Sequence, residues 1–156
     1  MKSSRIIFSG NLRTELLFQS ILLLPEAQQQ QVACFTVEKL VESIREQVRK
    51  AQDLKKLTPP KYVGAAKEYQ NACLLIDNLL KFDDHFRKDV DKCELSAVYA
   101  EYALSLKKHA PHLGAKEEVI KKCLALDPSN VIANGLKLDL EFDAFFLGQK
   151  VERHPS

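Results

Sequence analysis

Cysteine and histidine side chains are the groups in this sequence that could bind a metal ion or act as nucleophiles. The four cysteines are Cys34, Cys73, Cys93 and Cys123. A structural zinc site takes its ligands from closely spaced pairs such as Cys-x-x-Cys, and the sequence contains no such pair. His109 and His112 are close in sequence, but Pro111 interrupts the helical face that would have to present them together. The sequence therefore predicts no metal site and no cofactor, and it favours free thiols in a reducing compartment.

The segment Asp83-Asp84-His85 is the one compact cluster of side chains suited to acid–base chemistry. It follows an apolar stripe, where short polar side chains usually cap or solvate a turn between helices. The chain has no glycine-rich phosphate loop, no nucleophile elbow and no His-Glu-x-x-His motif. The sequence therefore predicts a protein that is not an enzyme and has no catalytic residues.

Composition and charge set the class of protein. A chain of 156 residues with 46% hydrophobic and 28% charged residues is ordinary for one globular domain. The net charge of +2, with acids interspersed among the lysine pairs, does not indicate a nucleic-acid partner. The longest unbroken apolar run is residues 72–76, far short of the roughly 20 residues of a membrane span. We therefore expect an intracellular, cytoplasmic protein.

The N-terminal residues allow an alternative localisation. Lys2, Arg5 and Arg13 are accompanied by several serines, and no acidic residue precedes Glu15. An acid-poor start that contains arginine and serine resembles a mitochondrial presequence. Residues 1–10 are therefore predicted to form an N-terminal arm, which is either an ordinary lead into the first helix or a targeting segment for mitochondria.

Helical periodicity covers most of the remaining chain. In the second predicted helix, Val37, Leu40, Val41 and Ile44 follow the three- and four-residue steps of one helix face. Prolines and glycines interrupt this pattern and predict about six helices within a single domain, residues 11–147, followed by a polar tail, residues 148–156. The expected helices span about residues 12–24, 26–56, 60–81, 91–108, 115–126 and 130–146.

The last of these helices has a competing interpretation. Residues 136–143 alternate strictly between apolar and charged side chains, which is the period of a half-buried strand. Residues 5–8 are the only plausible partner strand, and an isolated two-stranded pair is marginally stable. Helix is favoured because leucine, lysine, glutamate and alanine are good helix formers.

The turn Ala125-Leu126-Asp127-Pro128 supports a resemblance to a known repeat. If Pro128 closes a helical hairpin, Ile120 and Cys123 fall at a bulky and a small position of its second helix. Tyr99, Tyr102, Ala103 and Leu106 then follow the bulky–Leu–Gly–Tyr spacing of the first helix. This hairpin resembles a tetratricopeptide repeat, in which small residues stand where the two helices touch.

A weaker copy of the same pattern lies in residues 64–72, where Ala65, Tyr69 and Ala72 match small, aromatic and small positions. About residues 37–146 thus resemble a degenerate tetratricopeptide-repeat protein. The resemblance implies an all-α fold of stacked antiparallel helical hairpins with a protein-binding surface. A six-helix bundle that shares only the local turn is the alternative.

The last predicted helix is apolar on more than one face, which is unusual for a helix at the end of a stack. Its C-terminal apolar residues either fold back onto the first helix, near Leu16, Leu17 and Ile21, or bind a partner. The predicted partner-binding residues are Phe142, Phe145, Phe146 and Leu147. The sequence thus predicts a non-catalytic protein–protein interaction module or adaptor. The alternative is a structural or assembly subunit of a larger complex, which would be mitochondrial if the N-terminus is a targeting segment.

Overall fold

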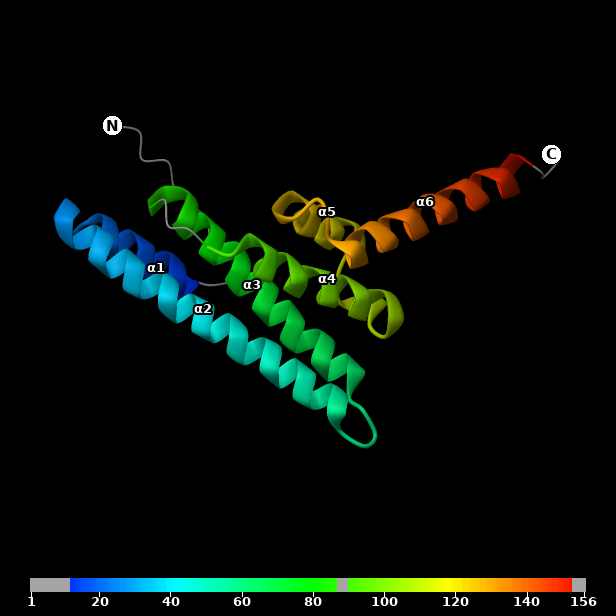
Figure 1. Cartoon of the computed structure of the whole chain (residues 1–156), viewed down its shortest axis with the longest axis horizontal. Helices are drawn as coiled ribbons and strands as arrows, with labels where there is room; N and C mark the ends of the chain where they lie inside the picture. Colours follow the sequence, from blue (N-terminus) through cyan, green and yellow to red (C-terminus); the bar gives the residue numbers. More distant parts are fainter. Residues whose placement is uncertain (1–11, 87–89, 153–156) are drawn as a thin grey trace. The chain divides into compact units, whose positions relative to one another are not determined.

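The computed structural model of the chain describes residues 12–86 and 90–152, and within them every regular element is helical (Figure 1). The predicted all-α fold with about six helices is confirmed. The predicted N-terminal arm, residues 1–10, lies outside the described residues. The elements are α1 (Leu12–Leu22), α2 (Glu26–Lys56), α3 (Tyr62–Phe86), α4 (Lys92–Lys108), the short 3₁₀ helix η1 (Pro111–Leu113), α5 (Lys116–Leu126) and α6 (Val131–Glu152).

The described chain divides into two compact units at Asp91, and each is described by itself. The single domain expected for residues 11–147 stays a prediction. Helices α1 to α3 form the N-terminal unit, and α4, η1, α5 and α6 form the C-terminal unit.

Helices α2 and α3 run side by side as a long antiparallel hairpin (Figure 1). Val37, Ile44 and Ala51 of α2 are buried, and their seven-residue spacing returns each to the same face after two turns. At the tip, the Lys61 amide donates a hydrogen bond of 3.0 Å to the Leu54 carbonyl, which closes the loop. The facing stripe of α3 consists of Ala65, Tyr69, Ala72, Ile76 and Leu79.

The end of α3 differs from the sequence-based expectation. The helix was expected to stop near Lys81, because the following residues are charged, but it continues to Phe86. Phe82 is fully buried, and its ring meets that of Phe18 edge to face, with 5.1 Å between the ring centroids. Burial of an aromatic ring outweighs the weak local preference of the aspartates for a turn. The prediction of a break at residue 82 was therefore wrong.

Helix α1 attaches to this hairpin through Ile21, one of the three residues expected to need cover, and through Phe18. Phe18 and Ile21 are buried, whereas Leu16 and Leu17 are 58% and 43% exposed. The Gln29 side-chain amide holds the connection by donating hydrogen bonds of 3.2 and 2.8 Å to the carbonyls of Leu22 and Leu24. Helix α1 thus docks along the line of Phe18 and Ile21.

In the C-terminal unit, α4 and α5 form a second, shorter hairpin through η1. Tyr99, Ala103 and Leu106 of α4 and Ile120 of α5 are buried in it. A side chain at Gly114 would place its Cβ 2.8 Å from the Tyr102 hydroxyl, so a larger residue there would have to displace the Tyr102 ring.

Helix α6 packs on its own unit only through its first half. Ala133 and Leu136 are buried, and Asp139 forms an ion pair with Lys107 of α4. All residues from 141 to 147 are exposed. The helix continues to Glu152, beyond the expected end near Phe146, and leads away from α4 and α5 (Figure 1). Residues 136–143 are helical, so the strand alternative was wrong.

Truncation of the buried ring of α1, Phe18→Ala, is expected to lower the free energy of unfolding by about 3 kcal/mol, because it removes a buried aromatic side chain and leaves a cavity. Urea denaturation followed by circular dichroism measures the change. Leu16→Ala, on the exposed side of the same helix, is the control and should shift stability by less than about 0.5 kcal/mol. Equal effects of the two variants would contradict the observed docking of α1.

Candidate functional site

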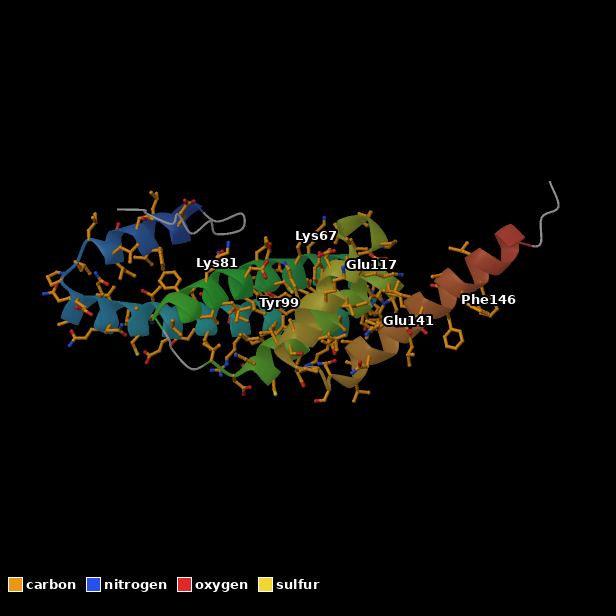
Figure 2. All side chains as sticks on the ribbon, turned by 90° about the horizontal axis from the view of Figure 1, so that it is seen from above. Lys67, Lys81, Tyr99, Glu117, Glu141 and Phe146 are labelled. Carbon is orange, nitrogen blue, oxygen red and sulfur yellow. The ribbon has the colours of Figure 1, made fainter. Side chains whose placement is uncertain are left out.

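Large apolar side chains gather on the part of α6 that extends beyond its own unit. Leu138, Phe142, Phe145 and Phe146 are 55%, 59%, 58% and 56% exposed. We refer to these four residues as the aromatic stripe. Figure 2 shows Glu141 and Phe146 on this extended segment. Single exposed apolar residues are common on proteins, but four neighbours on one helix form a patch of the kind found at binding sites.

The helical geometry explains why the stripe is not part of the core. Leu136, which is buried, and Leu138 are two residues apart, which is roughly 200° around a helix of 3.6 residues per turn. The aromatic stripe therefore lies on the face opposite to the one that packs on α4 and α5. Leu147 lies roughly three turns after Leu136 and therefore on the same side of the helix as Leu136. It is 64% exposed because the packed part of α6 ends before it. The structure thus separates Leu147 from the three phenylalanines with which it was predicted to act.

The ring of Phe146 contacts the rings of both Phe142 and Phe145. The rings of Phe142 and Phe146 are nearly parallel, with centroids 6.5 Å apart and planes inclined by 24°. Phe145 meets Phe146 edge to face, with 5.9 Å between centroids and 73° between planes. Stacked and edge-to-face ring pairs of this kind are slightly favourable in free energy, so the rings form a partly preorganised surface. Leu138, Glu141, Phe142 and Phe145 line an open depression of about 310 Å³ on this face.

Acidic residues border the aromatic stripe on both sides. Glu141 lies at the edge next to Phe145 and Asp139 at the edge next to Phe146, whereas Asp143, seven residues after Leu136, falls on the packed face of the helix. Asp139 is paired with Lys107. Neither Glu141 nor Asp143 forms an ion pair with a described side chain, and both are exposed. The surface is therefore an apolar strip bordered by Glu141 on one side and, on the other, by Asp139 in its ion pair with Lys107.

The alternative in which the α6 phenylalanines fold back onto the first helix assumed that this helix must bury Leu16, Leu17 and Ile21 against another element. Phe18 and Ile21 are buried inside the N-terminal unit, where each is 1% exposed. Leu16 and Leu17 remain exposed. Because α1 and α6 belong to different units, folding of the phenylalanines onto α1 and binding of the phenylalanines by a partner both stay predictions.

A buried polar network fixes the two helices that carry α6. The Ser96 hydroxyl of α4 donates to the Cys123 carbonyl of α5 at 3.1 Å, and the Cys123 thiol donates to the Ser96 carbonyl at 3.2 Å. The Oγ and Sγ atoms are themselves 3.1 Å apart. These reciprocal bonds satisfy both small side chains and bring the helix backbones close together.

The same network sets the start of α6. The Asn130 side-chain nitrogen donates to the Ser96 hydroxyl at 3.3 Å, while its oxygen accepts a bond of 3.0 Å from the Ala133 amide. The second bond is an N-terminal helix cap. One asparagine thus joins the start of α6 to α4.

The thiol of Cys123 is unsuited to act as a nucleophile. Burial raises its pKa, the carboxylate of Asp127 raises it further, and the hydrogen bond from Ser96 opposes these effects only in part. Because the thiolate is the reactive form, a raised pKa makes the side chain inert at neutral pH. The role of Cys123 is structural.

The other side chains singled out for chemistry do not come together. Cys34 and Cys93 are exposed and Cys73 is buried, all as free thiols. In the part of the chain that the structure describes, no group of three His, Cys, Asp or Glu side chains could hold a metal ion. The segment Asp83-Asp84-His85 belongs to the last turns of α3, and its side chains lie outside the described part.

Asn78 of α3 is a buried polar residue that sequence reasoning did not single out. It is fully buried, and neither side-chain polar atom has a hydrogen-bond partner among the described residues. A buried group without a partner costs roughly 1–3 kcal/mol of stability. Its position inside an apolar stretch, Leu75 to Leu80 apart from Asp77, was a signal that could have drawn attention to it.

Comparison with known proteins gives no identification: no family model, no curated protein and no solved structure matches the chain. The resemblance to tetratricopeptide repeats therefore stays a prediction. Of the described helices, none combines the length and the apolar character that crossing a membrane requires.

The pKa of Cys123 predicts a pH dependence of stability. Burial raises the pKa of Cys123 in the folded state, so the protonated thiol contributes to stability. This contribution is complete below the unfolded-state pKa of about 8.5 and is lost as the pH rises towards the folded-state pKa. Wild type should therefore lose stability between about pH 8 and pH 10 more steeply than Cys123→Ser, which keeps a hydroxyl for the network. Urea denaturation across this range measures the slopes. Cys93→Ser, at an exposed thiol, should follow wild type, and a common slope for all three proteins would contradict the assignment.

Replacement of the unpaired amide by an apolar side chain of the same shape, Asn78→Leu, is expected to raise the free energy of unfolding by about 1–2 kcal/mol. Asn71→Leu, at an exposed position of the same helix, is the control and should change stability by less than about 0.5 kcal/mol. Both are measured by chemical denaturation. A loss of stability in Asn78→Leu would show that this amide makes favourable polar interactions in the folded protein.

Proposed function

We propose that the chain is a non-catalytic protein–protein interaction module whose contact surface includes the aromatic stripe of α6. The observation that carries this proposal is the exposure of three phenylalanines, with Phe146 in ring contact with the other two, on a helix segment without packing in its own unit. Aromatic residues are enriched in the energetically dominant parts of protein interfaces.

The size of the surface indicates what kind of contact it makes. Four side chains that are nearly three-fifths exposed offer roughly 450 Å² of apolar surface, since one phenylalanine can bury about 150–250 Å². Removing this area from water is worth about 11 kcal/mol. Association itself costs on the order of 4–15 kcal/mol. The stripe alone therefore supports weak binding, and residues beside it must add to the interface.

The resemblance to tetratricopeptide hairpins supports the same class of function, because such hairpins commonly bind other proteins. The four free thiols favour the cytoplasm. The acid-poor N-terminal sequence favours mitochondria as the alternative.

A second candidate is a structural subunit whose α6 is permanently covered by a neighbour. The observation in its favour is the same exposed apolar surface, which obligate interfaces also present. The two candidates differ in the behaviour of the isolated chain: an adaptor stays monomeric and soluble when produced alone, whereas an obligate subunit aggregates without its neighbour and is rescued by it.

The double variant Phe145→Asp/Phe146→Asp is expected to lose capture of partner proteins by about tenfold or more, because it places charge in the centre of the apolar contact. Affinity capture with quantitative mass spectrometry measures the loss. The circular dichroism spectrum should be unchanged, since both side chains are exposed.

The matched control is Phe35→Asp. Phe35 is 59% exposed, as Phe142 is, but lies on α2 in the N-terminal unit. This variant should retain the captured proteins. Equal capture by wild type and the α6 double variant would refute the proposed contact surface, whereas loss of helical structure in the double variant would place the two rings in the core.

A further inference from the structure

We infer that the end of the α2–α3 hairpin binds the surface of a membrane that contains anionic phospholipid, with lysine side chains against the headgroups and apolar side chains among them. Residues 54–67, where α2 passes into α3, form this end of the hairpin, and we refer to them as the basic tip (Figure 1). The basic tip belongs to the N-terminal unit and shares no residue with the aromatic stripe, so the inference goes beyond the proposed function.

Positive charge is concentrated in the basic tip. It contains four lysines and no acidic residue, although the net charge of the whole chain is only +2. Lys56, Lys61 and Lys67 are exposed, and none of them forms an ion pair with a described side chain. The preceding acid, Asp53, lies 3.9 Å from the guanidinium of Arg49. The three lysines are therefore available to an external anion.

Apolar side chains are exposed on the same tip. Leu57, Tyr62 and Val63 are 45%, 39% and 40% exposed. The connecting loop, residues 57–61, is exposed throughout and contains two prolines, which have no amide hydrogen to remove from water. Proteins that lie at a membrane surface combine apolar side chains, which enter the headgroup layer, with lysines that stay in its polar part. The basic tip has both kinds of residue.

Backbone hydrogen bonds hold the basic tip in shape. The Lys61 amide donates to the Leu54 carbonyl at 3.0 Å, and the Ala65 amide donates to the Lys61 carbonyl at 3.0 Å. The helices approach closely at Gly64, where a Cβ would lie 3.4 Å from Cδ1 of Leu54. A loop that is already ordered avoids part of the entropy cost of binding.

The type of cation favours a lipid surface over an acidic protein. All four cations of the basic tip are lysines. Interfaces between proteins are depleted in lysine and enriched in arginine, because the planar guanidinium bonds carboxylates in pairs. An anionic membrane instead attracts each lysine without fixed geometry, by about fivefold in affinity per residue. A nucleic-acid backbone would satisfy the lysines but leave Leu57 and Val63 in water.

The chain itself offers no comparable acidic surface to cover the basic tip. The C-terminal unit has nine acidic and nine basic residues, so its net charge is zero. Beside its exposed aromatic stripe, Asp139 is paired with Lys107, which leaves Glu141 as the one unpaired carboxylate of the two that border the stripe. A second copy of the chain has the same charges, and two basic tips repel each other. An anionic bilayer therefore matches the basic tip better than another part of the chain does.

Flotation of the full chain with lipid vesicles measures the binding. We expect the chain to bind vesicles of phosphatidylcholine with about 30% phosphatidylserine at about 0.1 M salt. Binding should be about tenfold weaker or less when phosphatidylserine is omitted or the salt is raised to about 0.5 M.

Charge variants locate the contact. Lys56→Gln/Lys61→Gln should lower the partition coefficient about tenfold or more, because two attractions to the anionic surface are lost. Lys121→Gln/Lys137→Gln removes the same net charge from exposed lysines of α5 and α6, and it should keep the coefficient within about twofold of wild type. Circular dichroism should be the same for both variants and wild type, since all four side chains are exposed.

The apolar side chains have a separate test. Leu57→Ser/Val63→Ser should lower the partition coefficient about tenfold, because it removes apolar surface that leaves water on binding. Phe35→Ser, on α2 outside the basic tip, is the control and should change the coefficient by less than about twofold.

A single tryptophan reports the insertion directly, because the chain has no tryptophan of its own. The emission of Leu57→Trp should shift to shorter wavelength when anionic vesicles are added and should be quenched by brominated phospholipid. The emission of Phe35→Trp, at a side chain that is 59% exposed, should not change.

The opposite results overturn the inference. It is refuted if the chain does not bind the anionic vesicles, or if either double variant of the basic tip binds them as wild type does. Loss of binding in Phe145→Asp/Phe146→Asp alone would assign the lipid contact to α6. Emission of Leu57→Trp that is already shifted without vesicles would assign the basic tip to another part of the chain or, if the shift grows with protein concentration, to a second copy. Tighter binding to polyglutamate or duplex DNA than to vesicles would assign it to an acidic protein or a nucleic acid.

Discussion

The contact between Ser96 and Cys123 is the interaction on which the C-terminal unit depends. Two small side chains let α4 and α5 approach until each side chain bonds the carbonyl of the other residue. Asn130 then binds the Ser96 hydroxyl and caps α6 in the same place. The direction of α6, and with it the position of the aromatic stripe, is therefore set by this buried cluster together with the packing of Ala133 and Leu136 and the ion pair between Asp139 and Lys107.

The helical class and most helix boundaries could be predicted from the sequence, because they follow from periodicity, prolines and glycines. The end of α3 could not, because burial of Phe82 against Phe18 is a contact between residues far apart in the chain. Local charge at Asp83 and Asp84 suggested a turn, and tertiary packing overrode it. Phe18 was overlooked for the same reason: α1 carries apolar residues on several sides, and only its neighbours select the buried face.

The strand-like alternation in α6 has a physical explanation. Two residues along a helix is roughly 200°, so every second residue falls on the opposite face. Leu136 faces the unit and Leu138 faces away, and Leu140 and Phe142 repeat the pattern. Alternation with a period of two therefore arises from a helix with two apolar faces. The sequence shows that this helix has more apolar residues than one buried face can hold, so the phenylalanines could be recognised from it. Their separation from Leu147 could not, because the structure is needed to show which face packs on α4 and α5.

The exposure of residues 141–147 has a consequence for how this protein can change over time. Side chains that add no packing to their own unit contribute little to folding free energy, so substitutions there are limited by binding alone. Ser96, Cys123 and Asn130 are constrained in the opposite way, by folding. Substitutions in residues 141–147 are therefore expected to change the proposed contact surface while leaving the cluster at the start of α6 intact.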